Sequence, residues 1–429
     1  MKKIQRVVFL ICICATNASH ALLEIEINEG VESAMPIAIL AVQSDLQEQA
    51  ALLESVVYSN LYRSGMFSLL DKKQHPQIEV TGSTVNYDVW RNMSIEGLIS
   101  MRLQEQADEQ VKLEIELFDL VRKRRAMGRS IVFKKAALRR VAHKISDVIF
   151  QQFTGQPGAF STRIAYISET LDSQQQKNYQ LLIADSDGYN PTAVYTSGKQ
   201  LMSPAWSPNG QQLAYVSFEN ERTEIFLQEI VSGKREKISA QPGINSAPAW
   251  SPSGDYLALT LSFGGNPDIY IMDARTRKLR QLTKHYEIDT EPAWTPDGRY
   301  IIFTSNRSGS PQVYRISASG GEPVRITFTG NYNAAPTVSP NGESIAMVHN
   351  SGEGYRIALT DINGNQFRLI TDGVLDEAPS FAPNGSMIIY STRHKKGIVL
   401  SAVSIDGRVK QRLRLQRGKV REPAWSPFR

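Results

Sequence analysis

The stretch SPAWSPNG at residues 203–210 decides the fold, because close variants of it return along the rest of the chain. The later copies read APAWSPSG (247–254), EPAWTPDG (291–298), APTVSPNG (335–342), APSFAPNG (378–385) and EPAWSP (422–427). Their first prolines fall at 204, 248, 292, 336, 379 and 423, so neighbouring copies are 43 or 44 residues apart. An internal repeat of this length, filled with short strand signals, indicates a β-propeller.

Each copy predicts four strands. The leading proline is tolerated at the first residue of a strand, and the Pro-Asn-Gly that follows is turn chemistry. A second, fully apolar strand comes next, as at 257–261, and a third strand alternates between apolar and polar residues, as at 268–272. A polar turn then leads to the fourth strand, as at 279–283.

The number of blades follows from the two ends of the repeat region. Strand-like segments at 163–167, 179–184 and 192–195 precede the first copy and lack a first strand, whereas the last copy, at 422–427, lacks everything else. One blade built from both ends closes the ring and removes free sheet edges. We therefore predict a six-bladed propeller over residues 159–429, closed by the C-terminal strand.

Four tryptophans recur at one position of the repeat and could stack on a ligand. Because they return once per blade beside a proline, packing between neighbouring sheets is the favoured interpretation. These residues are Trp206, Trp250, Trp294 and Trp425.

Residues 22–158 lack the repeat and predict a small α/β domain. An alternating strand at 23–27 and a buried strand at 36–42 precede a helix at 46–62. A hairpin over 111–118 and 130–133 leads to a second helix at 136–153. The fold class is therefore multidomain, with an α/β domain followed by an all-β propeller.

The first 21 residues have the pattern of a secretory signal peptide. Three cations, an apolar run too short to span a bilayer and an Ala-Ser-His-Ala ending predict cleavage after Ala21 and export to the periplasm. Both cysteines, Cys12 and Cys14, fall inside this segment, and a residue as large as isoleucine before each disfavours a lipid anchor. The remaining chain then has no thiol, which excludes disulfides and thiolate catalysis. No later apolar run is long enough to predict a transmembrane segment.

The charge pattern gives little reason to expect a nucleic-acid partner. Removing Lys2, Lys3 and Arg6 takes the formal charge from +5 to +2. The basic region at 122–129 follows an alternating strand, so a charged hairpin turn is favoured over a nucleic-acid or membrane patch.

No catalytic motif is found. The sequence has no nucleophile elbow, phosphate loop, dinucleotide fingerprint or His-Glu-x-x-His pattern, and its six histidines lack ligand spacing. We expect no enzyme activity and no cofactor. Acidic residues before two of the copies, including Glu287 and Asp372, leave two alternatives open: a solvated rim, or a mouth that docks protein or a channel-bound cation.

The chain resembles the TolB family of the bacterial Tol–Pal system over nearly its whole length. The resemblance is carried by HKISDVIFQQFTGQPGAFSTRIAYI (143–167), LMSPAWSPNGQQLAYV (201–216) and FTSNRSGSPQVYRISASGGEPVRIT (303–327), with further matches at LYRSGMFSLLD (61–71) and DEAPSFAPNGSMIIYS (376–391). It implies a non-enzymatic periplasmic protein that links TolA to the lipoprotein Pal, maintains outer-membrane integrity and supports outer-membrane invagination during cell division. Other outer-membrane proteins are further expected partners. The competing hypothesis is a ligand-binding or peptidase-associated propeller of the cell envelope.

The resemblance also implies two binding regions. The TolA-binding segment corresponds to Leu22, Leu23, Glu24, Ile25, Glu26, Ile27, Asn28, Glu29, Gly30, Val31, Glu32 and Ser33, whose alternation suits addition to a partner's sheet edge. For Pal, the loops entering the first strands are the expected docking region: Ile244, Asn245, Ala247, Asp289, Thr290, Glu291, Asn333, Ala335, Asp376 and Glu377. If the segment also touches the propeller, it could couple the two partners.

Overall fold

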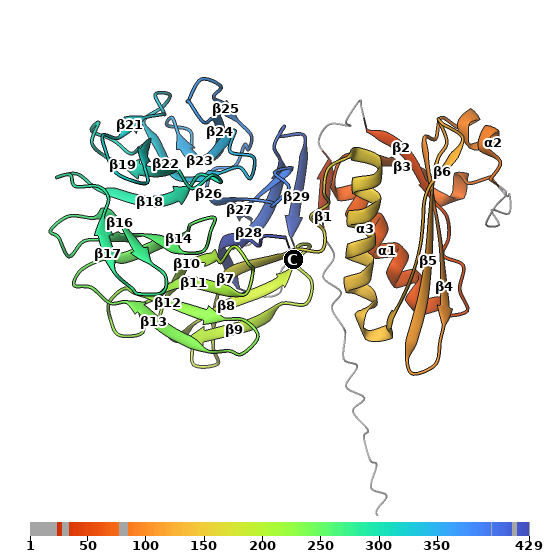
Figure 1. The fold of residues 1–429 in the computed structure, drawn as a ribbon, viewed down its shortest axis with the longest axis horizontal. Helices are drawn as coiled ribbons and strands as arrows, with labels where there is room; N and C mark the ends of the chain where they lie inside the picture. Colours follow the sequence, from red (N-terminus) through yellow and green to blue (C-terminus); the bar gives the residue numbers. More distant parts are fainter. Residues whose placement is uncertain (1–23, 28–33, 77–84, 396, 414–417, 429) are drawn as a thin grey trace, which may run out of the picture.

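The computed structural model describes residues 24–27, 34–76, 85–395, 397–413 and 418–428. A domain of helices and one sheet is followed by a ring of antiparallel sheets (Figure 1). The signal-peptide prediction, with its cleavage after Ala21, lies outside the described residues. So do Leu22, Leu23 and residues 28–33 of the expected TolA-binding segment.

The N-terminal domain contains a five-stranded sheet in the order β3-β2-β4-β5-β6. β2 is parallel to both of its neighbours, and the other pairs are antiparallel. The strands are β2 (Met35–Ile39), β3 (Phe67–Leu69), β4 (Gly97–Glu105), β5 (Gln110–Asp119) and β6 (Arg124–Lys134). The predicted alternation in β5 is confirmed, since its residues are buried and partly exposed in turn over most of its length.

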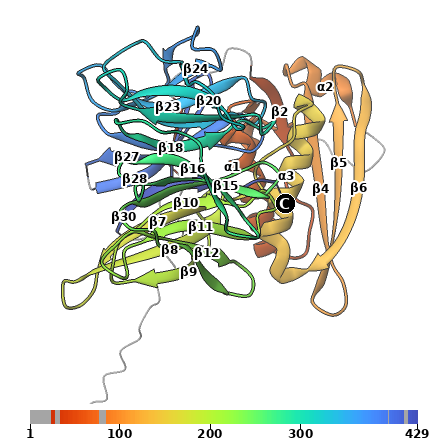
Figure 2. The same ribbon diagram turned by 60° about the vertical axis from the view of Figure 1, so that its left-hand side comes forward.

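Two long helices, α1 (Gln47–Arg63) and α3 (Leu138–Thr154), cover one face of this sheet, close to the predicted ranges. Their apolar sides, including Leu53 and Ile145, share one buried cluster with the sheet residue Met101. In Figures 1 and 2 both helices stand between the sheet and the propeller. The opposite face is partly covered by α2 (Tyr87–Asn92), and two short 3-10 turns are η1 (Lys72–Gln74) and η2 (Lys135–Ala137).

The rest of the described chain forms six blades of four strands, and this part of the prediction is confirmed. Blade 1 contains β30 (Lys419–Trp425), β7 (Arg163–Leu171), β8 (Lys177–Asp185) and β9 (Thr192–Ser197). Blade 2 contains β10 (Leu201–Trp206), β11 (Gln212–Ser217), β12 (Glu224–Glu229) and β13 (Arg235–Ser239). Blade 3 contains β14 (Asn245–Trp250), β15 (Tyr256–Leu261), β16 (Asp268–Asp273) and β17 (Leu279–Gln281).

The remaining blades follow the same plan. Blade 4 contains β18 (Asp289–Trp294), β19 (Tyr300–Ser305), β20 (Gln312–Ser317) and β21 (Val324–Arg325). Blade 5 contains β22 (Tyr332–Val338), β23 (Ser344–Asn350), β24 (Arg356–Asp361) and β25 (Arg368–Leu369). Blade 6 contains β26 (Asp376–Phe381), β27 (Met387–His394), β28 (Gly397–Ser404) and β29 (Val409–Leu413).

The ring closes as the sequence predicts. The C-terminal strand β30 is the first strand of blade 1 and pairs antiparallel with β7. The repeated tryptophans pack at the contacts between blades: the indole Nε1 of Trp206 donates to the carbonyl of Ala424 (2.9 Å), and that of Trp294 donates to the carbonyl of Ala249 (3.1 Å). Packing, rather than ligand stacking, is therefore their role at these two positions.

A short strand from the start of the described chain extends blade 6. This strand, β1 (Glu24–Ile27), pairs antiparallel with β29, with Glu24 opposite Arg412 and Ile27 opposite Val409. Four residues of the expected TolA-binding segment thus lie on the chain's own propeller, as the fifth strand of that sheet.

Candidate functional site

The propeller has two unlike faces. On one, here called the open face, lie the loops that enter each first strand and the loops between second and third strands. On the other, the junction face, lie the Pro-Asn-Gly turns and the loops between third and fourth strands. The N-terminal domain is held at the junction face, where the Asn384 side-chain amide donates to the carbonyl of Pro157 (3.0 Å) and Arg63 Nη2 donates to Ser186 Oγ (2.9 Å).

Four of the residues predicted to dock Pal are buried inside the loops of the open face. They occupy the same position in four blades, three residues before the first proline: Asn245, Asp289, Asn333 and Asp376. Their side chains form hydrogen bonds with neighbouring residues of the same face and so hold the loops in place. Asn245 Oδ1 accepts from Ser239 Oγ (2.7 Å), and the carboxylate of Asp289 accepts two hydrogen bonds from Arg307 (2.8 and 3.0 Å). These four residues shape the face rather than present side chains on it.

The residue before each first proline has a left-handed backbone. Its φ lies between 48° and 54° in all six blades, at Ser203, Ala247, Glu291, Ala335, Ala378 and Glu422. Each first strand shifts register at this point, so the distortion is a bulge built into the repeat. In blade 4 the carboxylate of Glu291 then accepts from the backbone N–H of Ala335 in blade 5 (2.7 Å). The predicted residues Ala247, Glu291 and Ala335 thus contribute to the linkage between blades as well as to the surface.

The open face carries an arc of exposed apolar side chains. The most exposed are Tyr286 (80%), Phe328 (71%) and Val374 (63%), each in a loop that leads into a new blade. Further members of this apolar arc are Ile244, Phe263, Ile288 and Tyr355. The arc runs from the entry of blade 3 to the entry of blade 6. Exposed apolar surface is typical of protein contacts, and this face offers it at the entries of four consecutive blades, 3 to 6.

Of the ten predicted docking residues, only Ile244 belongs to this arc. Thr290 and Glu377 are partly buried beside the first strands, as are the three bulge residues named above. The sequence prediction named residues at the ends of these loops nearest the proline, whereas the exposed apolar side chains lie mostly farther from the proline. The signal for the arc was present, because large apolar residues stand in loops that are otherwise polar, as in His-Tyr-Glu-Ile at 285–288.

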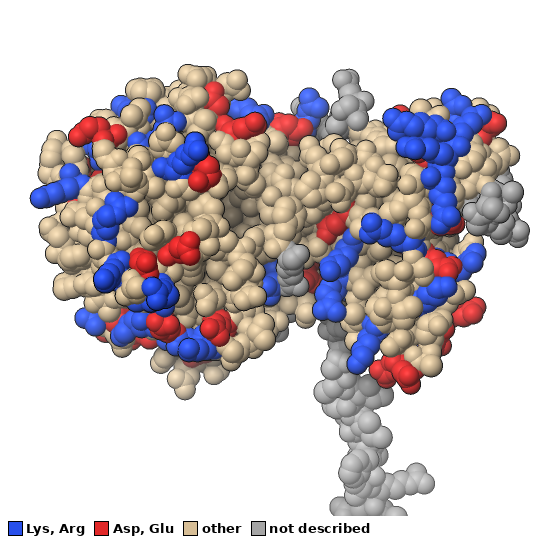
Figure 3. All heavy atoms as spheres, in the orientation of Figure 1, with Lys and Arg blue, Asp and Glu red and all other residues tan. Residues whose placement is uncertain are grey.

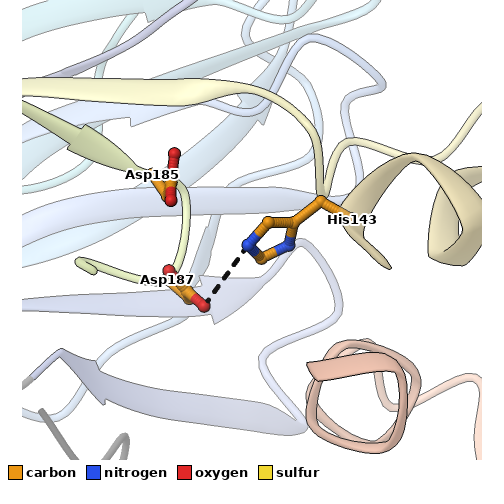
Figure 4. Close-up of side chains that lie close together, drawn as sticks. All are labelled: His143, Asp185 and Asp187. Atoms are coloured by element: carbon orange, nitrogen blue, oxygen red, sulfur yellow. Dashed lines mark ion pairs between the residues drawn. The ribbon is translucent and has the colours of Figure 1, made fainter. Parts of the chain in front are cut away.

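A second cluster of functional groups lies at the domain junction (Figure 4). His143 on α3 points toward Asp187 in the turn between β8 and β9, with 3.7 Å between Nε2 and Oδ2, and Asp185 lies nearby. Arg139, one turn earlier on α3, forms an ion pair with Asp187 and approaches Asp185 (Nε–Oδ2, 3.7 Å). The buried Arg63 reaches the same turn from α1. Charged groups of both domains thus meet in one buried place.

The hydrogen bonds around His143 argue against a metal ion among these three side chains. Ser146 Oγ donates to the carbonyl of Ala142, so it accepts from Asn60 Nδ2 (2.9 Å), and the same Asn60 nitrogen then donates to His143 Nδ1 (3.0 Å). This arrangement leaves the proton of the neutral ring on Nε2, which faces Asp187. A protonated nitrogen cannot bind a metal, and Arg139 already pairs with the carboxylate. The cluster is an ionic contact between domains.

Burial controls the protonation of this junction. It lowers the pKa of His143 to about 4, and the neighbouring carboxylate of Asp187 only partly opposes this effect. For Asp187, burial alone raises the pKa, but Arg63, His143 and Arg139 outweigh it and the pKa is lowered. The histidine is therefore neutral and the carboxylate ionised at neutral pH. The sequence prediction treated His143 as scattered and missed this contact.

None of the helices in the described part of the chain is long and apolar enough to cross a membrane.

Comparisons with known proteins agree with this architecture. The family described as "TolB beta propeller domain" matches residues 150–429, and the one described as "TolB amino-terminal domain" matches residues 23–126. The Tol-Pal system protein TolB of Thioalkalivibrio sulfidiphilus is 56% identical over 430 aligned residues, covering 100% of this chain and 98% of that protein. Its counterpart in Nitrosococcus oceani is 50% identical and covers 99% of this chain and 98% of that protein.

A solved structure gives the same result in three dimensions. The crystal structure of TolB from Acinetobacter baumannii superposes with a TM-score of 0.86 and 38% sequence identity, covering 95% of this chain and 100% of that chain. Both domains and their sequences are thus shared with these proteins over almost the full length. The chain belongs to the TolB family and is a Tol–Pal system component.

Proposed function

We propose that this chain is a non-enzymatic periplasmic adaptor that binds Pal with the open face of its propeller and TolA with residues 22–33. In this role it helps to maintain outer-membrane integrity and to draw the outer membrane inward at division. The alternative of a ligand-binding or peptidase-associated propeller stays a second hypothesis.

The apolar arc is the observation that carries the proposal. Its seven members lie on the face opposite the N-terminal domain, so a partner can reach them without displacing the chain's own contacts. Aromatic side chains on a convex rim, such as Tyr286 and Phe328, suit a folded protein partner, because they supply contact area at a small cost in side-chain entropy. A small-molecule ligand would instead favour an enclosed pocket.

The strand β1 supports the second half of the proposal. An extended segment that pairs with β29 through its backbone can pair equally with the sheet edge of a partner. Residues 24–27 cannot pair with β29 and with a partner's sheet at the same time. TolA binding then requires that β1 leaves blade 6, and a ligand that alters the position of blade 6 changes the free energy of this step.

Calorimetric titration of residues 22–429 with the soluble domain of Pal from the same organism tests the first half. We expect saturable one-to-one binding. A matched pair of variants separates the faces: Phe328→Asp, in the arc, should weaken binding, whereas Val231→Asp, in a loop of the junction face and 98% exposed, should not. Absence of binding by a well-folded sample would overturn the assignment of Pal.

Deletion of residues 22–33 tests the coupling between the two sites. We expect the affinity for Pal to change and the affinity for the soluble domain of TolA to be lost. An unchanged Pal affinity would contradict coupling while leaving the adaptor role intact. Retained TolA binding would contradict the role of the segment.

A further inference from the structure

The β5–β6 hairpin of the N-terminal domain ends in an exposed apolar side chain that is followed in the chain by four basic residues. β5 ends at Asp119 and β6 begins at Arg124, so residues 120–123 form the tip. Val121 at this tip is 58% exposed. A single exposed valine is ordinary on a protein surface, and the charges around it are what distinguish this one.

Five basic side chains lie in the tip or on the elements next to it. Four follow Val121 directly in the chain and all are exposed: Arg122, Lys123, Arg124 and Arg125. The fifth, Arg91, lies at the end of α2, which is tied to the hairpin by the ion pair between Lys123 and Asp88 (2.7 Å). Figure 3 shows a group of Lys and Arg side chains along the upper edge of the N-terminal domain.

Acidic residues compensate this group only in part. Three ion pairs join Lys123 to Asp88, Arg122 to Asp119 (2.9 Å) and Arg125 to Glu116 (3.1 Å). Glu96, which is exposed and accepts at its backbone carbonyl from the N–H of Leu120, is a fourth acidic residue at the tip, so five cations against four carboxylates leave a net charge of +1. Within the described part of the chain, neither Arg91 nor Arg124 forms a close ion pair, although Arg91 helps to lower the pKa of Asp88 and Arg124 helps to lower that of Asp119. The cation of each pair is at least 47% exposed, and exposed pairs exchange readily for another anion.

We propose that this hairpin tip docks the N-terminal domain on an anionic phospholipid bilayer. Val121 enters the headgroup region, and the neighbouring arginines and Lys123 bind lipid phosphates. An exposed apolar residue on the same hairpin tip as several exposed cations fits a membrane surface, where apolar burial and attraction to anionic lipids act together. Arginine binds phosphate oxygens through two parallel N–H groups, and four of the five cations are arginines.

The shape of the tip favours a bilayer over an acidic protein or a nucleic acid. A hairpin turn is convex, so it contacts a plane through the exposed side chains of its tip, among which Val121 is the apolar one. An acidic peptide would pair with the exposed edge of β6 and would leave the valine in water. Nucleic acid requires a longer basic stripe than one hairpin supplies. The tip is remote from the apolar arc, so both surfaces can be occupied together (Figure 1).

Vesicle co-sedimentation of residues 22–429 tests the proposal. We expect binding to phosphatidylethanolamine–phosphatidylglycerol vesicles, weakening as salt is raised, and no binding to phosphatidylcholine vesicles. The variant R91E/R124E breaks no described ion pair and should lower the partition coefficient at least tenfold. Its control is R275E/K278E, an equal charge reversal at exposed residues of blade 3, which should bind as the parent does.

Substitutions of Val121 separate docking from general charge attraction. Val121→Ser should weaken binding and Val121→Trp should strengthen it, each with an unchanged melting temperature. Any one of three results would overturn the proposal. These are no binding of the parent chain to the vesicles, a loss of binding in the control variant as large as that in R91E/R124E, or no change in binding with either Val121 substitution. Capture on immobilised acidic peptide without any vesicle binding would overturn it in favour of an acidic protein partner.

Discussion

The two faces of the propeller are built from different loops of the same repeat, and they make contacts of opposite kinds. The junction face meets the N-terminal domain through buried charges, with Arg63, Arg139 and His143 around Asp187. The open face pairs some of its charges inside its own loops, as with Asp289 and Arg307, and exposes apolar side chains such as Tyr286 beside other charges that stay in solvent, such as Asp372. Buried ionic contacts specify one fixed neighbour, whereas an exposed apolar rim remains available to a partner that comes and goes.

The largest effect should come from breaking the junction. Asp187→Ala removes the ion pair between Arg139 and Asp187 and leaves Arg139 only the longer contact with Asp185. It also removes one of the three carboxylates whose charges compensate the buried Arg63, so that Asp147 and Asp185 remain. Removing one partner of a buried ion pair costs about 3 kcal/mol. Calorimetry should show the N-terminal domain melting earlier than the propeller. The control Asp255→Ala, at an exposed carboxylate of blade 3, should change stability by less than about 0.5 kcal/mol. If the two variants had the same melting temperatures, the ionic contact at Asp187 would not stabilise the junction between the domains.

The next largest effect concerns pH. Because the pKa of His143 is lowered from 6.5 to about 4, the unfolded chain binds this proton at a higher pH than the folded chain. The free energy of unfolding should therefore fall as pH drops from 6.5 to 4, by up to about 3 kcal/mol from this residue. His143→Gln retains an acceptor for Asn60 and cannot titrate in this range. Urea unfolding at several pH values should show that the free energy of unfolding depends less steeply on pH in this variant than in the parent chain. An identical pH dependence in the two would show that His143 does not cause the loss of stability.

A smaller effect is expected on the open face. Phe328→Asp places a charge within the apolar arc and should weaken Pal binding about 30-fold, or about 2 kcal/mol, typical of a central contact residue. Its melting temperature should not change, because the side chain is 71% exposed. Titration calorimetry provides the affinity. A variant that binds normally would place the contact elsewhere on the propeller.

The smallest effect compares two glycines with the same left-handed backbone. A Cβ on Gly65 (φ 68°) would lie 2.1 Å from Val409 Cγ2 in blade 6, whereas a Cβ on Gly155 (φ 77°) meets nothing within 4 Å. Both substitutions by alanine lose about 1 kcal/mol to backbone strain. Gly65→Ala should lose about 1 kcal/mol more, measured by urea unfolding, and Val409→Ala should restore part of the difference. Equal losses would show that the domains separate easily at this contact.

The propeller could be predicted from the sequence because its evidence is repeated. Variants of the Pro-Ala-Trp-Ser strand occur six times, so a pattern that is weak evidence for a strand in one copy becomes strong evidence when repeated. The incomplete first and last copies of the repeat indicated that the C-terminal strand, β30, closes the ring. Helices α1 and α3 followed from apolar spacing, and the glycine after each, Gly65 and Gly155, has a positive φ as a helix C-terminus favours. Repeats and apolar spacing can both be recognised in the sequence without knowledge of tertiary contacts.

The parts that were missed depend on contacts between distant residues. The helix α2 and the strand β4 have no repeat to support them, and the pairing of β1 with β29 joins residues almost 390 positions apart. The junction brings His143 to Asp187 through the docking of two domains, which no spacing in the sequence records. The burial of Asn245 and Asp376 depends on the loop conformation of each blade, so exposure could not be ranked within those loops.

Hydrogen–deuterium exchange of residues 22–429, with and without the soluble domain of Pal, tests the central claim most directly. We predict new protection in the open-face loops around residues 244, 286, 328 and 374, and none in the junction-face turns around residues 231, 297 and 341. Protection confined to the junction-face turns, with the open-face loops unchanged, would contradict the assignment of the open face as the partner-binding surface.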